Sequence, residues 1–160
     1  MKQIIAGTGL AILMASASFA EDRHAEKNKA VVRRVFTDIL TQGRYEAVSE
    51  IYAHDFVNHQ AAKDVGLDED MAGNRGWRSA FPDLEMVVEK EIAEGDFVTV
   101  LWKGRGTNTG NGNGLSATGK KAEGRGISMF RVVNGKIQEE WTEYSQLLLL
   151  QELGLMPKLQ

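Results

Sequence analysis

The sequence predicts an α+β domain in which helices pack on one face of a curved antiparallel sheet. The first half of the chain carries apolar residues at helical spacing, as at Val31, Val35 and Ile39, which indicates an amphipathic helix. From Leu84 onward, apolar residues recur at every second position, which is typical of strands. Helices followed by strands that hairpins can connect favour an α+β architecture over a parallel sheet.

The elements expected before the last hairpin follow from these two periods and from the positions of glycine and proline. The proline at position 82 ends a helix, because the residue before a proline is biased away from helical backbone. The glycine-rich stretch after residue 104 does not fit a dinucleotide- or phosphate-binding loop, because a strand and not a helix follows it. The expected helices cover residues 22–42, 44–53, 67–80 and 147–153, and the expected strands cover 56–59, 84–92 and 97–104.

The last hairpin, residues 124–145, has a turn that specifies its register. Asn134-Gly135 lies between two strand-like runs, and this pair favours a two-residue type I′ turn. A regular ladder from that turn places on one face of the sheet the pairs Val132–Ile137, Phe130–Glu139, Ser128–Trp141, Gly126–Glu143 and Gly124–Ser145. We interpret this face as one wall of a pocket, because glycine in a strand often marks the close approach of a ligand or another chain.

The first twenty residues have the features of a secretory signal peptide. Lys2 is followed by an apolar run over residues 4–14 and by Ser18-Phe19-Ala20, which resembles a signal-peptidase site. The run is shorter than the ~20 residues that a membrane span needs. The sequence therefore predicts a signal peptide over residues 1–20, a single domain over residues 21–160, and a periplasmic or secreted protein.

The composition excludes several classes of function. The chain has 19 Lys and Arg against 22 Asp and Glu, a net charge of −3, whereas a nucleic-acid partner would favour a basic patch. The absence of cysteine excludes disulfides, a thiol nucleophile and thiolate metal sites. His59 with Glu139 or Glu143 is the one conceivable set of metal ligands, and we expect neither a metal nor another cofactor.

Six short blocks span nearly all of the mature chain, and they are residues 56–59, 80–84, 106–110, 117–120, 135–141 and 150–154. In their residues, order and spacing these blocks resemble the SnoaL-like polyketide cyclase (ester cyclase) family of the NTF2-like superfamily. The resemblance implies an NTF2-like cone, in which a strongly bent sheet wraps around helices and encloses an apolar pocket. It also implies ring closure by intramolecular aldol condensation without metal or cofactor, the activity of the founding members.

The chain departs from the family at the position that carries the chemistry. In the cyclases a catalytic aspartate lies four residues after the tryptophan that corresponds to Trp141, and here that position is Ser145. Asn108 stands where the family often has histidine, whereas the Asn58-His59 pair is retained. A serine hydroxyl is a weak base that needs an activating partner, so with Ser145 at the acid/base position we expect cyclase activity to be weak or absent.

Two other residues are candidates for the base that removes a proton next to a carbonyl group. A regular ladder places Glu143 on the same face as Ser145, and burial would raise the pKa of its carboxyl toward neutral pH. The alternative is a solvated glutamate that pairs with Arg105 or Arg125. His59 titrates near neutral pH, and its alternative is a hydrogen-bonded structural histidine.

The remaining candidates would line the ligand site. They are polar or aromatic residues placed near the pocket wall by the ladder or by the resemblance, and the aromatic ones are alternatively core residues. The expected ligand-binding residues are Asn58, Asn108, Trp102, Phe130, Trp141 and Tyr144. The four leucines at 147–150 are expected to cap the pocket or to form a dimer surface.

Two hypotheses for function follow. The first is an exported enzyme that isomerises, cyclises or dehydrates a small hydrophobic carbonyl compound by proton transfer without a cofactor. The second is a binding module that kept the pocket and lost the catalytic aspartate. A homodimer through the sheet is compatible with both.

Overall fold

The computed structural model describes residues 8–157, so the first seven residues of the predicted signal peptide lie outside the described part. The helical elements are α1 (Thr8–Arg34), the π-helix η1 (Val35–Thr41), the 3₁₀-helix η2 (Tyr45–Ala47), α2 (Val48–Ile51), α3 (Leu67–Ala80) and α4 (Gln146–Leu153). The strands are β1 (Tyr52–His59), β2 (Asp64–Gly66), β3 (Glu85–Glu94), β4 (Phe97–Thr107), β5 (Lys121–Val133) and β6 (Lys136–Tyr144).

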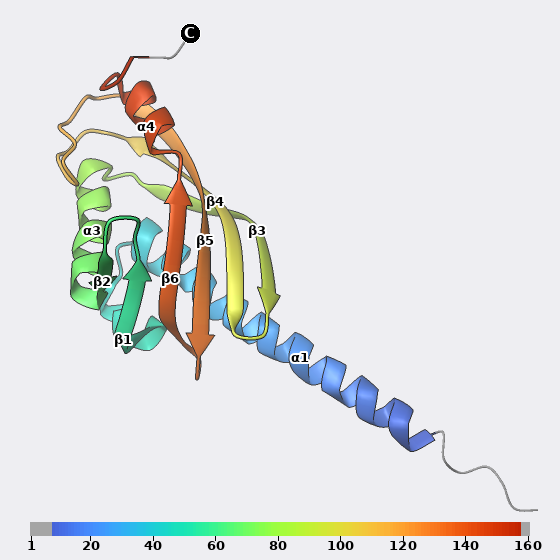
Figure 1. Cartoon of the computed structure of the whole chain (residues 1–160). Helices are drawn as coiled ribbons and strands as arrows, with labels where there is room; N and C mark the ends of the chain where they lie inside the picture. The colour runs from blue at the N-terminus through green and yellow to red at the C-terminus, as the bar shows by residue number, and fades with distance from the viewer. Residues whose placement is uncertain (1–7, 158–160) are drawn as a thin grey trace, which may run out of the picture.

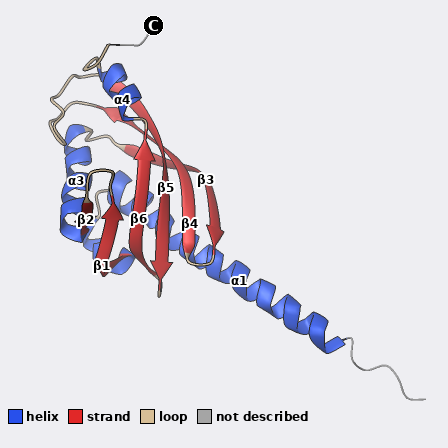
Figure 2. Ribbon diagram, viewed as in Figure 1, coloured by secondary structure: helices blue, strands red, loops and turns tan. Residues whose placement is uncertain are grey.

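The strands form one curved sheet in the order β2-β1-β6-β5-β4-β3. All neighbouring pairs are antiparallel except β1 and β6, which are parallel. The helices α1, η1 and α3 pack against one face of this sheet, called here the inner face, and no helix of the described residues covers the middle of the opposite, outer face (Figures 1 and 2). The predicted α+β class and the NTF2-like arrangement are therefore confirmed, with one parallel pair in an otherwise antiparallel sheet.

The main core lies between the inner face and the N-terminal helices. Phe36 of η1 meets Phe130 of β5 edge to face, with ring centroids 6.1 Å apart, and Tyr52 meets Phe56 in the same way at 4.9 Å. Burying a side chain of this size stabilises the fold by roughly 1.5–3 kcal/mol. The same buried cluster includes Val32, Ile39, Ile51, Val98, Val100, Val132 and Ile137.

Several predicted elements differ from the structure at their ends: the strand expected over residues 56–59 begins at Tyr52, the strand expected over residues 97–104 continues to Thr107, and two helices also differ. The helix expected over residues 22–42 forms, but its last part is a π-helix, and Gly43 follows it with φ +66°. The helix expected over residues 44–53 stops at Ile51, because Tyr52 already pairs with Ile137 as the first residue of β1. Pairing with β6 thus overrides the local helical pattern. No helix of the described residues is long and apolar enough to cross a membrane.

A β-bulge at Gln138 decides which side chains of β6 face inward. Val132 pairs with Ile137 as predicted, but the next pair is Arg131 with Glu139, so Gln138 is an extra residue in the ladder. A bulge inserts one residue into one strand, and a shift of one residue exchanges the two faces of everything beyond it. The other four predicted pairs are therefore wrong. In the structure, Phe130 pairs with Glu140, Ser128 with Thr142 and Gly126 with Tyr144.

The structure does not support the predicted reason for the glycines of β5, which was the close approach of a ligand. A Cβ atom on Gly126 would collide with the indole ring of Trp102, so the close approach comes from the neighbouring strand and not from a ligand. At Gly124, by contrast, no heavy atom lies within 4 Å of the place that a Cβ would occupy.

Candidate functional site

Polar side chains from three strands meet on the inner face beside the apolar core. The indole Nε1 of Trp102 on β4 donates to Oγ of Ser128 on β5 at 2.9 Å. Ser128 Oγ lies 2.6 Å from Oγ1 of Thr142 on β6, and Thr142 Oγ1 donates to Oε1 of Glu140 at 2.8 Å. The bulge makes this row possible, because it turns Glu140 and Thr142 toward the helices.

A second group of polar side chains reaches the same place from β1 and α3. Asn58 is the backbone partner of Glu140 in the parallel β1–β6 pair, and its Nδ2 donates to Oδ1 of Asp70 at 2.7 Å. Asn74, one turn further along α3, donates to Oδ2 of Asp70 at 3.1 Å. Two carboxyl groups, Glu140 of β6 and Asp70 of α3, thus lie near each other where α3 packs on the inner face.

The electrostatics of this acidic pair differ from those of surface carboxylates. Burial and, to a lesser extent, the negative charge of Asp70 together raise the pKa of Glu140 to about 8, against the opposing effect of the Thr142 hydrogen bond. Burial also raises the pKa of Asp70, against the hydrogen bonds from Asn58 and Asn74. No Lys, Arg or His of the described residues forms an ion pair with either carboxyl group. Two nearby carboxyls without a cation hold on to a proton between them.

The acidic pair lies where the inner face changes from sealed to partly accessible. Phe130, Val132 and Ile137 are at most 1% exposed, whereas Glu140 and Thr142 farther along β6 are half-buried. Protein surrounds the Glu140 carboxyl closely enough to raise its pKa although the residue keeps exposed surface. This combination is expected of a group on a concave wall.

Two buried polar atoms, the hydroxyl of Tyr52 and Oδ1 of Asn58, lack a partner within the described part of the chain. Both are sealed from solvent, and neither makes a hydrogen bond with any described residue. Burial raises the pKa of the Tyr52 hydroxyl, and the charges of Glu140 and Asp70 add to this effect. A sealed polar group without a partner costs about 1–3 kcal/mol, so each atom could gain from a water or a ligand group.

The structure separates the predicted base Glu143 from this site. Glu143 pairs with Ile127, whose side chain is 52% exposed on the outer face, and Glu143 itself is exposed. The predicted inner placement of Glu143 is wrong, because it assumed a ladder without the bulge. Within the described residues its suggested partners bind elsewhere, Arg105 to Glu85 and Arg125 to Glu123.

Ser145, at the family's aspartate position, follows the end of β6. It is exposed and precedes α4 as its N-cap residue, without a side-chain capping bond. Its backbone N–H donates to the carbonyl of Arg125 at 2.9 Å. The hydroxyl therefore has no activating base bonded to it among the described residues.

His59 and Trp141 meet on the outer face. Their rings stack at a centroid distance of 4.6 Å and an interplanar angle of 17°. His59 Nε2 lies 3.1 Å from Glu139 and Nδ1 lies 3.1 Å from Asp64, and the Glu139 bond is the main cause that raises the histidine pKa. Because both ring nitrogens are occupied, the geometry supports the structural alternative for His59, and Trp141 lies away from the acidic pair.

The other predicted ligand-binding residues divide between the site and the scaffold. Asn58, Trp102 and Phe130 lie on the inner face as described above, and Tyr144 meets Trp77 of α3 edge to face at 6.0 Å. Asn108 is completely buried. Its amide donates to the carbonyls of Ala80 and Gly110, each at 3.1 Å, so it fastens the glycine-rich loop to the end of α3.

Sequence reasoning missed Asp70, Thr142 and Glu140 as site residues. Asp70 looked like one of several acidic residues in the first turn of a helix, where they favour the helix dipole. Glu140 is next to Glu139, and alternation allows only one of the two to face inward. The family block around residues 135–141 contains both glutamates, but it carries no sign of the bulge that selects between them.

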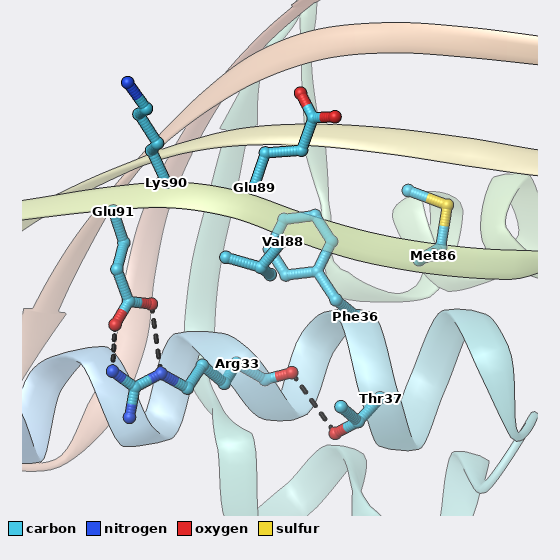
Figure 3. Close-up of a pocket in the computed structure, with 8 residues that line it drawn as sticks. All are labelled: Arg33, Phe36, Thr37, Met86, Val88, Glu89, Lys90 and Glu91. Atoms are coloured by element: carbon cyan, nitrogen blue, oxygen red, sulfur yellow. Dashed lines mark hydrogen bonds and ion pairs between the residues drawn. The ribbon is translucent and has the colours of Figure 1, made fainter.

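A separate hollow of about 430 Å³ lies between α1, η1 and the edge strand β3 (Figure 3). Phe36, Met86 and Val88 form its apolar part, and the ion pair between Arg33 and Glu91 closes one side. It contains neither member of the acidic pair. Within residues 8–157, no three His, Asp or Glu side chains come together in a way that could hold a metal ion.

Comparison with known proteins agrees with this fold. The family model of the SnoaL-like polyketide cyclases matches residues 30–153 of this chain. The chain belongs to the SnoaL-like polyketide cyclase family. A search of curated proteins gave no match.

Several solved structures share the fold at low sequence identity. AclR from Streptomyces galilaeus, provisionally assigned as a hydroxylase, is 24% identical with a TM-score of 0.77, over 85% of this chain and 86% of AclR. IdmH from Streptomyces antibioticus, provisionally assigned as a polyketide cyclase, is 24% identical with a TM-score of 0.70, over 79% of this chain and 98% of IdmH. A SnoaL-like protein from Jannaschia sp. CCS1 is 23% identical with a TM-score of 0.75, over 83% of this chain and 95% of that one.

Proposed function

We propose that this SnoaL-like protein is a cofactor-free proton-transfer enzyme for a small hydrophobic carbonyl compound, and that Glu140 is the group that moves the proton. The observation that carries the proposal is the position of Glu140. It is an inner-face carboxyl with a pKa of about 8, beside Asp70 and not paired with any cation of residues 8–157. This replaces Glu143 and His59 as the candidate base.

The chemistry follows from the basicity of such a carboxyl. An ionised Glu140 is a stronger base than an ordinary glutamate, so it can take the proton from the carbon next to a carbonyl group. Returning that proton to another atom of the same molecule isomerises it. Attack of the enolate carbon on a second carbonyl closes a ring and leaves an alkoxide that takes the proton back from Glu140. Loss of a hydroxyl from the carbon next to the enolate dehydrates the compound, and the proton leaves with that hydroxyl as water. Each outcome starts with the same proton transfer, so the proposal concerns that step.

The pair of carboxyls sets the pH at which Glu140 becomes the base. With one proton between them, one carboxyl is ionised while the other is neutral, because two like charges this close resist ionising together. Asn58 and Asn74 donate to Asp70 and favour its ionised form, whereas burial favours the neutral form of Glu140 at neutral pH. Turnover that needs ionised Glu140 should rise about tenfold per pH unit and level off above pH 8.

A binding module without catalysis is the second candidate. The exposed Ser145, without a base bonded to it, favours this alternative, since the residue that corresponds to the family's catalytic aspartate cannot act. Under this alternative the raised pKa of Glu140 would be a by-product of burial.

Exchange of hydrogen for deuterium tests the proton transfer directly. The protein is incubated in D₂O with a panel of aromatic and cyclic ketones, and NMR follows loss of the protons next to each carbonyl. We expect Glu140→Gln to lower exchange by about 10²–10⁴-fold, whereas Glu139→Gln, Glu143→Gln and His59→Ala leave it within a few-fold of the wild type.

The variants also discriminate between the hypotheses. Equal exchange by the wild type and Glu140→Gln contradicts the proposal, and loss of exchange in Glu143→Gln restores the earlier candidate. Binding of a ketone without exchange by the wild type at any pH between 6 and 10 supports the binding module.

Export and dimerisation are also proposed, on separate grounds. Export rests on the signal-like sequence, and mass spectrometry of the exported protein should find Glu21 at its N-terminus. A homodimer through the outer face is supported by exposed Ile127 and Phe97 there, at 52% and 41%. Ile127→Lys should then shift the light-scattering mass from two chains to one.

A further inference from the structure

The three hydrogen bonds that lead to Glu140 form a continuous row across the inner face. They pass from Trp102 on β4 to Ser128 on β5, and then to Thr142 and Glu140 on β6, over distances of 2.9, 2.6 and 2.8 Å. Ser128 and Thr142 are direct cross-strand partners. The row thus joins three adjacent strands at one level of the sheet.

The indole of Trp102 at one end of the row determines the direction in which its hydrogen bonds are donated. An indole N–H can only donate, so Ser128 Oγ accepts from Trp102. The one hydroxyl hydrogen of Ser128 is then free to donate to Thr142, whose own hydrogen donates to Oε1 of Glu140. With the opposite direction, Ser128 would receive two donors and its own hydrogen would have no acceptor among the bonds of the described residues, which costs free energy in a buried place.

The position of Trp102 is itself fixed. Its ring lies across Gly126, where any side chain would collide with it, and it packs on Phe36 at a centroid distance of 6.5 Å. The donor at the start of the row is therefore held by the backbone of β5 and by the core.

The two oxygens of Glu140 have different surroundings. Oε1 accepts from Thr142. Oε2 makes no hydrogen bond with any residue in the described part of the chain. It is also not one of the solvent-inaccessible polar atoms that lack a partner there, so it keeps some contact with solvent. Oε2 is therefore the oxygen that keeps contact with the accessible side of the inner face.

We propose that Trp102, Ser128 and Thr142 are positioning residues that keep Oε1 of Glu140 a hydrogen-bond acceptor in both protonation states, so that Glu140 takes up and releases its proton on Oε2. The inference deepens the proposed function and rests on it for its catalytic meaning. The row orients the carboxyl plane, directs the reactive lone pair away from β5, and stabilises the ionised form of a carboxyl that burial would otherwise keep neutral.

Carbon-13 NMR of protein labelled at the glutamate carboxyl carbons tests the row without any substrate. The Glu140 signal is assigned by its loss in Glu140→Gln, and its pKa is measured in each variant. Thr142→Val removes the donor, and we expect the pKa of Glu140 to rise by about one unit, because a donor favours the charged form. Thr142→Ser keeps a hydroxyl and should restore the wild-type value. Thr99→Val, on the outer part of β4 beside Met129, is the matched control and should not change it.

The indole N–H of Trp102 gives a second and independent signal. In a directed row, ionisation of Glu140 polarises each donor in turn, so the Trp102 N–H resonance should titrate with the midpoint of Glu140. Ser128→Ala interrupts the row and should abolish this titration, whereas the N–H of Trp77 serves as the internal control. A Trp102 resonance that is insensitive to the ionisation of Glu140, or an unchanged Glu140 pKa in Thr142→Val, overturns the inference.

The experiments distinguish failure of the proposed positioning role from failure of the proposed function. If Glu140→Gln abolishes exchange but Thr142→Val leaves the Glu140 pKa unchanged, the function stands and the positioning role is wrong. If the NMR titrations behave as expected while no ketone exchanges, the row exists and the enzymatic proposal fails. If both hold, Thr142→Val should lower kcat with little change in KM, and Thr142→Ser should recover it.

Discussion

Glu139 and Glu140 are neighbours on β6 and have opposite surroundings. Glu139 points to the outer face, where Arg131 lies 2.6 Å and His59 3.1 Å from its carboxylate, and these bonds lower its pKa. Glu140 points to the inner face, where it has Thr142 as a donor and no cation of the described residues, and its pKa rises to about 8. Two identical side chains one residue apart are thus a surface ion-pair member and a candidate catalyst.

The difference shows that the face of the sheet, more than the residue type, decides what a carboxyl can do. On the outer face, cations and solvent stabilise the charge, so the group remains ionised and takes part in structure. On the inner face, desolvation and the like charge of Asp70 destabilise the charge, so the group becomes able to exchange a proton near neutral pH.

The largest expected effect is on the pH dependence of stability. The pKa of Glu140 is about 8 in the folded protein against an ordinary value of 4.5, so the folded state binds more protons between these values and stability falls as pH rises. Glu140→Gln removes this loss, and its advantage in unfolding free energy should grow by up to roughly 1.4 kcal/mol per pH unit across that range. Urea unfolding at several pH values measures it.

Glu139→Gln is the matched control for that experiment. A carboxyl with a lowered pKa stabilises the fold above its ordinary value of 4.5 and loses this effect as pH falls through the folded value. The variant should therefore be less stable than the wild type at neutral pH, by about 0.2–1 kcal/mol for a partly exposed pair. Equal pH profiles for the two variants would remove the distinction between the faces.

The next largest effect concerns the packing of Trp102 against Gly126 and its contribution to stability. Gly126→Ala places a Cβ against Trp102, and we expect a loss of about 1–3 kcal/mol in unfolding free energy, as for other overpacked sites. Gly124→Ala, on the same strand and face, meets nothing within 4 Å and should stay within about 0.5 kcal/mol. Similar losses in both would show that strand propensity, and not the tryptophan, explains the glycine at 126.

A smaller effect separates the two causes of the Glu140 shift. Asp70→Asn removes the neighbouring negative charge but leaves the burial, which is the larger cause. The pKa of Glu140 should fall by about one unit and still remain above 4.5. Carbon-13 titration of the labelled carboxyl measures this, and an unchanged value would mean that the two carboxyls do not interact.

The smallest expected effect is on the pKa of His59 on the outer face. His59 has a pKa raised above 6.5, chiefly through Glu139, so its pairs stabilise the fold below pH 6.5 and lose that effect as pH rises through the folded value. Both Glu139→Gln and Asp64→Asn should lower the pKa of His59, and Glu139→Gln should lower it more. Proton NMR of the imidazole ring gives both values. A larger effect of Asp64→Asn would reverse the assigned order of the causes.

Much of the fold was accessible from local patterns. The helix over residues 67–80 forms with the predicted bounds, and the Asn134-Gly135 turn has φ values of 52° and 76° as a type I′ turn needs. These features depend on a few adjacent residues. The start of β1 at Tyr52 depends on pairing with a strand some 80 residues away, and no local pattern records that partner.

The candidate site was accessible only in part, and for a related reason. Asn58 and Trp102 were predicted through the resemblance and the alternation of β4, and both lie by the acidic pair. The bulge at Gln138 adds one residue to β6 without a distinctive residue type, so the ladder counted from the turn arrived at Glu139, Trp141 and Glu143 in place of Glu140 and Thr142. Asp70 needed the packing of α3 against β1 before its neighbours were known.

The extra residue at Gln138 also has a consequence for how this chain should be compared with others. Alternation along a strand is a matter of odd and even positions, so a one-residue insertion or deletion before Glu139 would change the glutamate that meets Phe130 and leave the rest of the sequence intact. Positions on β6 are therefore equivalent between two such proteins when they oppose the same residue of β5, and not when they are equally far from the turn. Which carboxylate of such a strand faces the helices follows from its pairing with β5, as it does for Glu139 and Glu140 in this chain.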